Sequence, residues 1–569
     1  MPQGRRKVPF SAKQKKLQLQ AKRHKKQGLL EHQSDDSERS RDQPRVQKIN
    51  QQPTTAAGKS NRYALQFFKE TNEEIQQRKE QARQAIVPVT EEELEIDIDN
   101  YFLPELDFPK RPLWDYEMTK EEIDLQENRY FREYLAGIEK QFPLKDLSYF
   151  ELNLETWRQL WRVIEMSDII LIIVDIRFSA LMFPPSLYKF VVEDLKKEMI
   201  LVLNKIDLAP AELVVAWKYY FLSKFPSIHI LTFTSVPGYN LHGNVESKMN
   251  AKRKARMRMS FEGAQKLQEL CDKIVGSEVD LSSWKKKIIE EKSKEYDNEE
   301  LEVEQSTEIT SIDTSYHKHQ KFRDGVLTIG CIGQPNVGKS SLMNAIIGKK
   351  VVSVSKTPGH TKHFQTIFLT PTVKVCDCPG LVFPSKVPKV LQVLMGSFPI
   401  AQLREPYTSV KYIAERIDLV KLLHLQHPND DEEWSSMDIC DGWAKKRGFL
   451  TARAARLDSY RAANHLLRLA LDGKICLCLR PAGYSTKIEH WKTHPEIQEV
   501  LWIQAKNKSE ESQLRGNIES DEDESDSCRS SGDSGETDSG EDSDESDVES
   551  TGDFSSASTN KFAALGEVE

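Results

Sequence analysis

Runs of apolar residues, many of them β-branched, recur through the middle of the chain at the length of a β-strand. Three such runs, with segments of helical length between them, are followed after a long gap by three more. They occupy residues 169–175, 199–203, 229–233, 327–332, 366–369 and 373–376. Strands that are apolar on both faces and alternate with helices are typical of a parallel sheet covered on both sides. The pattern therefore predicts an α/β fold.

Helical periodicity is found on both sides of these strands. A helix is predicted just before the first strand, with one apolar face formed by Trp157, Leu160, Trp161 and Ile164. Beyond Pro384 the pattern is helical to about residue 495. One helix there has a predicted apolar face formed by Tyr460, Ala463, Leu467 and Leu471, and Gly473 is expected at its C′ position.

Composition divides the chain into five parts. They are a basic, disordered arm (1–60), an extended segment with short helices expected to wrap a neighbour (61–148), the sheet-containing domain (149–385), a helical region (386–500) and an acidic, disordered tail (509–569). Within the domain, residues 236–322 lose the strand pattern and are interpreted as an insertion or linker.

The two ends of the chain carry opposite charges, which the net charge of −8 conceals. Residues 1–27 hold ten Lys or Arg and no acidic residue, whereas residues 519–553 hold sixteen Asp or Glu and one base. A basic arm is the electrostatic footprint of RNA binding and is also typical of a nuclear import signal. The alternative is a solvated arm without a fixed partner. No RNA-recognition or KH signature is present, so RNA contacts are expected through phosphates and shape.

Cysteines and hydropathy exclude several classes of protein. The eight cysteines are scattered and include no Cys-x-x-Cys pair, which argues against a disulfide framework or a zinc site. No apolar stretch approaches 18 residues, and none follows the basic N-terminal charges. We therefore expect an intracellular protein in a reducing compartment, without a membrane span or a secretory signal.

A glycine-rich loop follows the predicted strand 327–332 and opens an apolar helix, which is the context that a phosphate-binding loop requires. It consists of Gly333, Gln334, Pro335, Asn336, Val337, Gly338, Lys339 and Ser340. Its backbone N–H groups can cradle phosphates at the helix N-terminus. Lys339 would reach the β- and γ-phosphates, and the Ser340 hydroxyl would bind Mg²⁺. A glycine turn without a ligand is the alternative.

A second motif ends the last predicted strand and consists of Asp377, Cys378, Pro379 and Gly380. Asp-x-x-Gly alone is frequent, and its place two strands after the phosphate loop gives it weight. Asp377 would lie near the metal, and the Gly380 N–H would sense the γ-phosphate. Residues 357–361 lie between the two motifs, where a switch loop belongs. Thr361, in preference to Thr357, would complete the Mg²⁺ shell, and a simple Pro-Gly turn is the alternative.

A third motif follows the strand at 199–203 and consists of Asn204, Lys205, Ile206 and Asp207. The Asp207 carboxylate would accept from the ring N–H and the exocyclic amine of guanine. Adenine lacks that pattern, which disfavours an ATP-dependent enzyme. Asn204 would tie this loop to the phosphate loop, while the Lys205 stem would lie along the base. Thr234 and Ser235, after the next strand, are where backbone amides would meet the guanine oxygen. A polar strand-to-helix turn is the alternative.

The order of these motifs differs from that of an ordinary GTPase. The base-reading motif precedes the phosphate loop by more than a hundred residues, whereas ordinarily it follows. A circular permutation that opens the chain after residues 377–380 would give this order. The order, with segments 149–158, 356–361 and 460–464, resembles the circularly permuted GTPases of ribosome assembly, which include nucleostemin and the large-subunit GTPases. Residues 175–179 depart from the family's Asp-Ala-Arg-x-Pro, so the role of the Arg177 loop stays open.

The resemblance implies a circularly permuted P-loop GTPase domain followed by a small helical region. It implies a GTP- and Mg²⁺-dependent switch with slow hydrolysis in ribosome or ribonucleoprotein assembly, with rRNA or pre-ribosomal particles as partners in the nucleus or nucleolus. The alternative is a nucleotide-binding nuclear scaffold with little turnover that recruits proteins. Leu381 stands where Ras-type GTPases carry a water-orienting glutamine, which predicts slow turnover. In the resembling cation-dependent enzymes an asparagine placed as Asn336 binds K⁺; the alternative is that Asn336 only satisfies its turn.

Overall fold

A computed structural model describes the chain over residues 46–48, 66–115, 117–234, 262–293, 320–348, 365–429, 431–451 and 456–504. Most of the predicted basic arm, the whole acidic tail, and the predicted site residues Ser235 and Thr361 lie outside the described residues. One short strand is described within the predicted arm. Strand β1 (Val46–Lys48) pairs antiparallel with β2 (Gln66–Phe68).

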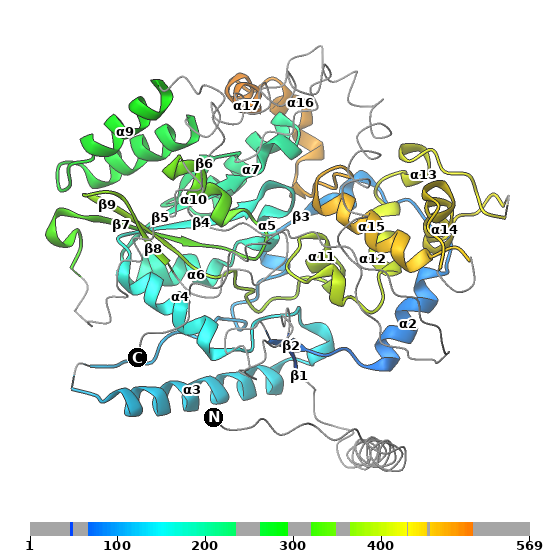
Figure 1. Ribbon diagram of the computed structural model, residues 1–569, viewed down its shortest axis with the longest axis horizontal. Coiled ribbons are helices and arrows are strands. Elements are labelled where there is room, and N and C mark those ends of the chain that lie inside the picture. Colours follow the sequence, from blue (N-terminus) through cyan, green and yellow to red (C-terminus); the bar gives the residue numbers. More distant parts are fainter. Residues whose placement is uncertain are drawn as a thin grey trace, which may run out of the picture. The chain divides into compact units, whose positions relative to one another are not determined.

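The core is a six-stranded sheet in the order β6-β5-β4-β7-β9-β8 (Figure 1). Its strands are β4 (Ile169–Asp175), β5 (Glu198–Asn204), β6 (His229–Thr232), β7 (Leu327–Ile332), β8 (Gln365–Thr370) and β9 (Val373–Asp377). Every predicted apolar run therefore forms a strand. The runs in β4, β5 and β7 are buried almost throughout, which explains why the sequence pattern was so clear.

The expectation of a parallel sheet is correct except at one edge. Strands β4, β5, β6, β7 and β9 are parallel, but β8 pairs antiparallel with β9. The turn between them, residues 371–372, is too short for the crossover that a parallel pair needs. Strands β5, β4, β7 and β9 are successive parallel neighbours in the sheet, so their carboxyl ends meet at one edge.

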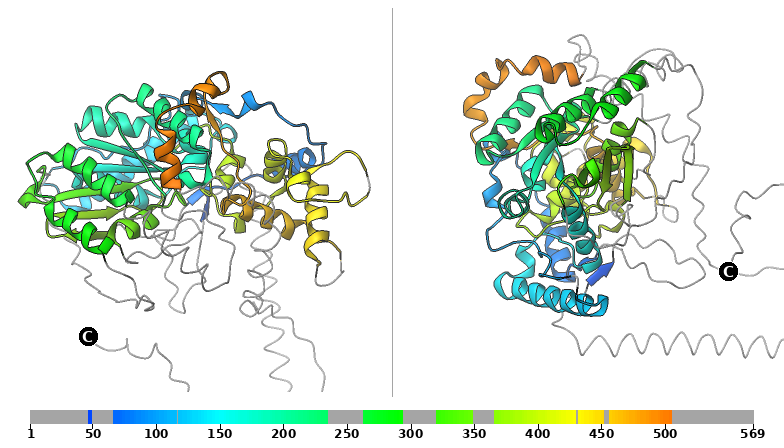
Figure 2. Two further views of the ribbon diagram at one scale, coloured as in Figure 1. Left: turned by 90° about the horizontal axis from the view of Figure 1, so that it is seen from above. Right: turned by 90° about the vertical axis from the view of Figure 1, so that its left-hand side faces the viewer.

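Helices lie against both faces of the sheet (Figure 2). They include α4 (Leu154–Met166), α7 (Ala211–Lys224), α9 (Ser282–Ser293) and α10 (Lys339–Ile347). The predicted face of α4 is confirmed: Trp157, Leu160, Trp161 and Ile164 are all buried. Short helical turns α5 (Ser179–Met182), α6 (Pro185–Tyr188) and a π-helical turn (Lys189–Asp194) connect β4 to β5.

The segment predicted as an insertion contributes to this core where it is described. Trp284 of α9 is fully buried, and Leu267 and Cys271 of the preceding helical stretch are buried as well. The Lys287 ammonium donates to the Leu369 carbonyl of β8 over 3.0 Å. Residues 262–293 therefore pack on the sheet rather than forming only a connection.

Residues 66–148 contain α2 (Asn72–Ala82), β3 (Glu95–Ile96) and α3 (Lys120–Gln141). With 22 residues, α3 is longer than the short helices expected here; it begins at a capping box formed by Thr119 and Glu122. Strand β3 pairs with β10 (Arg480–Pro481), far along the chain. Figure 1 shows α3 as a long helix beside the sheet domain.

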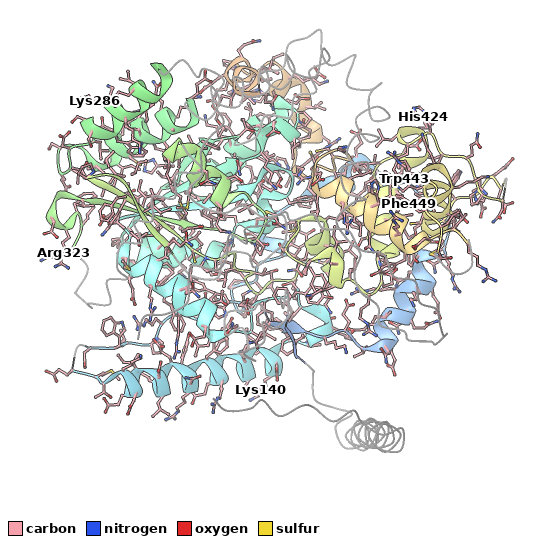
Figure 3. The ribbon with its side chains drawn as sticks, viewed as in Figure 1. Lys140, Lys286, Arg323, His424, Trp443 and Phe449 are labelled. Atoms are coloured by element: carbon pink, nitrogen blue, oxygen red, sulfur yellow. The ribbon has the colours of Figure 1, made fainter. Side chains whose placement is uncertain are left out.

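The region after β9 is helical, as expected. It contains α11 (Lys389–Leu394), α12 (Tyr407–Ala414), α13 (Leu419–Leu422), α14 (Ser436–Arg447), α15 (Ser459–Leu471), α16 (Ile488–Lys492) and α17 (Ile497–Gln504). The fully buried Trp443 of α14 donates its indole N–H to His465 of α15, and Phe449 packs edge-on against the same histidine. Figure 3 labels Trp443 and Phe449 in the helical region.

The predicted end of α15 is confirmed, because Gly473 has φ 78° just beyond Asp472, the C-cap. Its predicted face is partly wrong. Ala463 and Leu467 are buried, but Tyr460 is 43% exposed and donates its hydroxyl to the Leu403 carbonyl. No helix among the described residues is long and apolar enough to cross a membrane.

Candidate functional site

The predicted phosphate loop joins the central strand β7 to α10 at the edge where the strands end. Asn336 and Gly338 have φ values of 59° and 96°, so the backbone turns sharply before α10 begins at Lys339. A Cβ atom on Gly333 would lie 2.5 Å from the Ile173 carbonyl oxygen, so a larger residue does not fit there. A loop of this shape in front of a helix presents backbone N–H groups to an anion.

Lys339 is buried within this loop. Its ammonium donates to the carbonyls of Gly333 over 2.9 Å and Gln334 over 2.8 Å. Burial lowers the pKa of Lys339, and the nearby Asp377 carboxylate acts in the opposite direction. These two carbonyls hold the ammonium at the phosphate loop, where an anion would bind.

Asp377 and Ser340 lie together, as the sequence suggested. The Ser340 hydroxyl is 3.4 Å from one Asp377 oxygen, and the other oxygen has no hydrogen-bond partner among the described residues. Burial raises the pKa of Asp377 to about 6. A buried carboxylate with a free oxygen beside a hydroxyl is a donor set that suits Mg²⁺. These two residues therefore fit the expected metal.

The chain after Asp377 runs along the phosphate loop. The Leu381 N–H donates to the Gly333 carbonyl over 3.2 Å. A Cβ atom on Gly380 would lie 2.8 Å from the Pro335 Cα, so the two segments are in direct contact only because residue 380 is glycine. Cys378 is buried and donates its N–H to the Cys331 carbonyl. Leu381 itself is fully buried.

The predicted base-reading loop follows β5, which β4 separates from β7, and side-chain hydrogen bonds join it to the phosphate loop. The Asn204 amide donates to the Val337 carbonyl, and the Lys205 ammonium donates to the Asn336 carbonyl, each over 2.7 Å. Lys205 has φ 59°, which turns the chain into the short 3₁₀ helix Ile206–Leu208. Two motifs separated by more than a hundred residues thus form one site.

Asp207 and Thr234 are also brought together. The Thr234 hydroxyl donates to an Asp207 oxygen over 2.6 Å. Burial raises the pKa of Asp207, while the hydrogen bond from Thr234 acts to lower it. The threonine therefore holds the carboxylate in one orientation and helps to keep it ionised.

Sequence reasoning left Arg177 without a role and did not single out Asp175. The buried Asp175 carboxylate accepts from the Arg177 guanidinium over 3.0 and 2.9 Å, and from the Lys205 ammonium over 2.7 Å. Burial opposes ionisation, but the two cations outweigh it and hold the pKa of Asp175 well below its ordinary value. Arg177 also donates to the Ala470 carbonyl of α15 over 2.8 Å. Asp175 is a charged residue at the end of a fully buried strand, and this was the signal in the sequence that could have identified it.

The helical region contacts the phosphate loop directly as well. The Asn336 amide donates to the Gly396 carbonyl over 2.9 Å, and the Ser397 hydroxyl donates to the Gln334 side-chain oxygen over 2.7 Å. Both partners lie just after α11. The segment downstream of Asp377 therefore contacts the phosphate loop twice, first at Gly380 and Leu381 and again at Gly396 and Ser397.

Comparison with known proteins agrees with this geometry. Residues 328–434 match the 50S ribosome-binding GTPase family. Guanine nucleotide-binding protein-like 1 of Mus musculus is 47% identical over 88% of this chain and 90% of its own length. The Homo sapiens protein of that name is 46% identical with the same coverage. The chain belongs to the guanine nucleotide-binding protein-like 1 family of circularly permuted GTPases. Its family makes it a GTP-binding protein.

More distant similarities are also found. Large subunit GTPase 1 homolog of Bos taurus is 32% identical over 66% of this chain and 66% of its own length. Among solved structures, GNP-bound YlqF from T. maritima covers 58% of this chain and 98% of its own, with 16% identity and a TM-score of 0.32.

Proposed function

We propose that this protein is a slow, Mg²⁺-dependent GTPase that works as a nucleotide-controlled switch in the assembly of ribosomes or other ribonucleoprotein particles. The observation that carries the proposal is the path of the chain after Asp377. This path passes the phosphate loop at Gly380 and Leu381, enters α11, and contacts the loop again at Gly396 and Ser397.

Such a path links phosphate sensing to the helices. Val382 and Phe383 are buried, and the Val382 carbonyl accepts from the Glu151 N–H. A γ-phosphate that orders residues 377–381 must therefore shift the packing of the segment leading into α11. This is the order–disorder class of switch, in which the ligand biases one of two states. We propose that residues 149–385 form the GTPase domain and that residues 386–500 form the helical region that responds to it.

Within the site, we propose roles for the residues that would contact the phosphates, the metal and the base. Lys339 neutralises charge on the β- and γ-phosphates, and the backbone of residues 333–338 holds them by N–H groups. Ser340 and Asp377 would hold Mg²⁺, which offsets phosphate charge when bound; Thr361 is proposed as a further ligand. Asp207 reads the guanine base, with Thr234 fixing its carboxylate.

Slow turnover is proposed from position 381. Leu381 has no hydrogen-bonding side chain and is fully buried, so it is unsuited to orient an attacking water. Positive charge from K⁺ is proposed in place of an arginine finger. The Asn336 amide nitrogen is engaged by Gly396, which leaves its side-chain oxygen as the atom able to bind a cation. The alternative is that Asn336 only satisfies its turn; the bond to Gly396 joins that turn to the segment after α11.

Ribosomal or ribonucleoprotein partners are proposed from the basic residues 1–27 and from the match to the 50S ribosome-binding GTPase family. A nuclear or nucleolar location is proposed on the same charges. Cross-linking to RNA in cells tests this, with Lys339→Ala compared to the parent protein. We expect rRNA or its precursors to be enriched with the parent, and the amount to change in the variant. No enrichment of RNA over a control protein would contradict the proposed partner.

A second candidate, a nucleotide-binding scaffold with little turnover, is favoured by the burial of Leu381. Single-turnover hydrolysis separates the two functions. The switch requires that bound GTP be converted to GDP in K⁺ on the timescale of minutes to hours, and Lys339→Ala must abolish the reaction. GTP that stays intact for as long as it stays bound would favour the scaffold.

A further inference from the structure

The backbone of the loop that carries Asp207 is contacted by a distant segment, residues 473–504, here called the latch segment. The Gln504 side-chain amide, 2% exposed at the end of α17, donates to the carbonyls of Ile206 over 2.7 Å and Ala209 over 2.8 Å. Both N–H groups of this one amide are thus engaged by the two residues that flank Asp207 and Leu208.

The backbone carbonyl of Leu208, which lies between Ile206 and Ala209, also accepts from the latch segment. The thiol sulfurs of Cys476 and Cys478 lie 2.8 and 3.5 Å from the Leu208 oxygen. Gly473 packs so closely that a Cβ atom there would lie 2.5 Å from a methyl carbon of Leu208. Three of the four backbone carbonyls of residues 206–209, namely those of Ile206, Leu208 and Ala209, therefore receive donors from residues more than 260 positions away.

Among the described residues, the Gln504 side chain makes no hydrogen bond other than these two. Its side-chain oxygen is buried and has no hydrogen-bond partner among the described residues. Burying an unpaired amide oxygen is unfavourable, so the two donated bonds must offset that cost. A buried amide that only filled space would be replaced at lower cost by an apolar side chain. This arrangement indicates that the position of the loop carbonyls depends on Gln504.

We propose that Gln504 is a positioning residue for Asp207, and that the latch segment thereby determines how tightly the guanine base is held. Asn204 joins the loop to the phosphate loop and Thr234 fixes the Asp207 carboxylate, while the latch segment contacts the loop backbone. Gln504 acts through the backbone on either side of Asp207. The inference rests on the proposed role of Asp207 as the reader of guanine.

The test uses the full-length chain and fluorescent GDP. Gln504→Met keeps a similar side-chain length but removes both donors. We expect its dissociation constant for GDP to rise about tenfold, from the loss of two buried hydrogen bonds. The increase should come mainly from faster dissociation, and preference for guanine over xanthine diphosphate should fall.

A matched control separates positioning from general stability. Ser436 donates its hydroxyl to the Ala82 carbonyl over 2.7 Å, a buried hydrogen bond between two segments without contact to the base-reading loop. Ser436→Ala should lower the melting temperature to a similar extent while leaving GDP dissociation unchanged. If both variants weaken GDP binding equally, or if Gln504→Met leaves binding unchanged, the positioning role is wrong.

A parallel measurement distinguishes this failure from that of the base-reading proposal. Asp207→Asn must weaken GDP binding if Asp207 reads guanine. When Asp207→Asn weakens binding and Gln504→Met does not, only the positioning role is overturned. When neither does, the base-reading assignment itself fails, and the positioning role with it.

Discussion

At the proposed nucleotide site, single side chains would act through hydrogen-bonding groups that a change of one atom can remove. Asp207 has a carboxylate that can only accept, and it is oriented by Thr234. Asparagine has the same shape but offers one acceptor and two donors. Asp207→Asn should therefore cost about 1–3 kcal/mol of GTP binding free energy and shift preference toward xanthine nucleotides. Competition binding measures this, and unchanged GTP affinity would contradict the assignment.

Asn336 is the second residue whose role depends on one atom. Its amide nitrogen donates to Gly396, and its oxygen is the proposed K⁺ ligand. We expect GTP hydrolysis by the parent protein to be faster in K⁺ than in Na⁺ at equal ionic strength, and Asn336→Ala to lose that preference. No preference in the parent would exclude the ion. Equal K⁺ stimulation of both proteins would mean that Asn336 is not its ligand.

At the scale of elements, Glu151 joins three segments just before α4. One carboxylate oxygen accepts from the N–H groups of Gln66 and Asn153, while the other is buried without a partner among the described residues. Burial raises the pKa of Glu151 to about 8. Between its ordinary pKa of 4.5 and this value, the unfolded chain loses the proton and the folded chain keeps it. Stability should therefore fall as pH rises through this range.

Glu151→Gln removes that titration while keeping the accepting oxygen. Relative to the parent, the variant should gain on the order of 2 kcal/mol of unfolding free energy on going from pH 5 to pH 8. Urea denaturation at the two pH values measures the difference. A constant offset between variant and parent at both values would mean that Glu151 titrates normally in the folded protein.

The elements differ in how well the sequence predicted them. The strands were predictable because runs such as 169–174 are buried on both faces. The face of α15 was less so, since Tyr460 lies in the first turn and reaches Leu403 instead of the core. The contacts of Gln504 with Ile206 and of Arg177 with Ala470 leave no pattern in the sequence, because they depend on how distant segments fold together.

For the molecule as a whole, the circular permutation places one region in contact with both halves of the nucleotide site. The chain continues from Asp377 into α11, which is followed by contacts with the phosphate loop, and it ends its described course at Gln504 on the base-reading loop. An unpermuted domain would have its base-reading half after the phosphate sensor instead. In the proposed switch, the helical region would therefore respond to the phosphates and influence the base.

Hydrogen exchange of the full-length protein, compared between GDP and a non-hydrolysable GTP analogue, tests the switch most directly. Residues 385–420 include α11 and the contacts of Gly396 and Ser397 with the phosphate loop. We expect the amide protection of residues 385–420 to differ between the GDP-bound and the analogue-bound protein. The amide protection of α3, which is remote in sequence from the site, should be the same with both nucleotides. Identical protection of residues 385–420 with both nucleotides bound would contradict the switch.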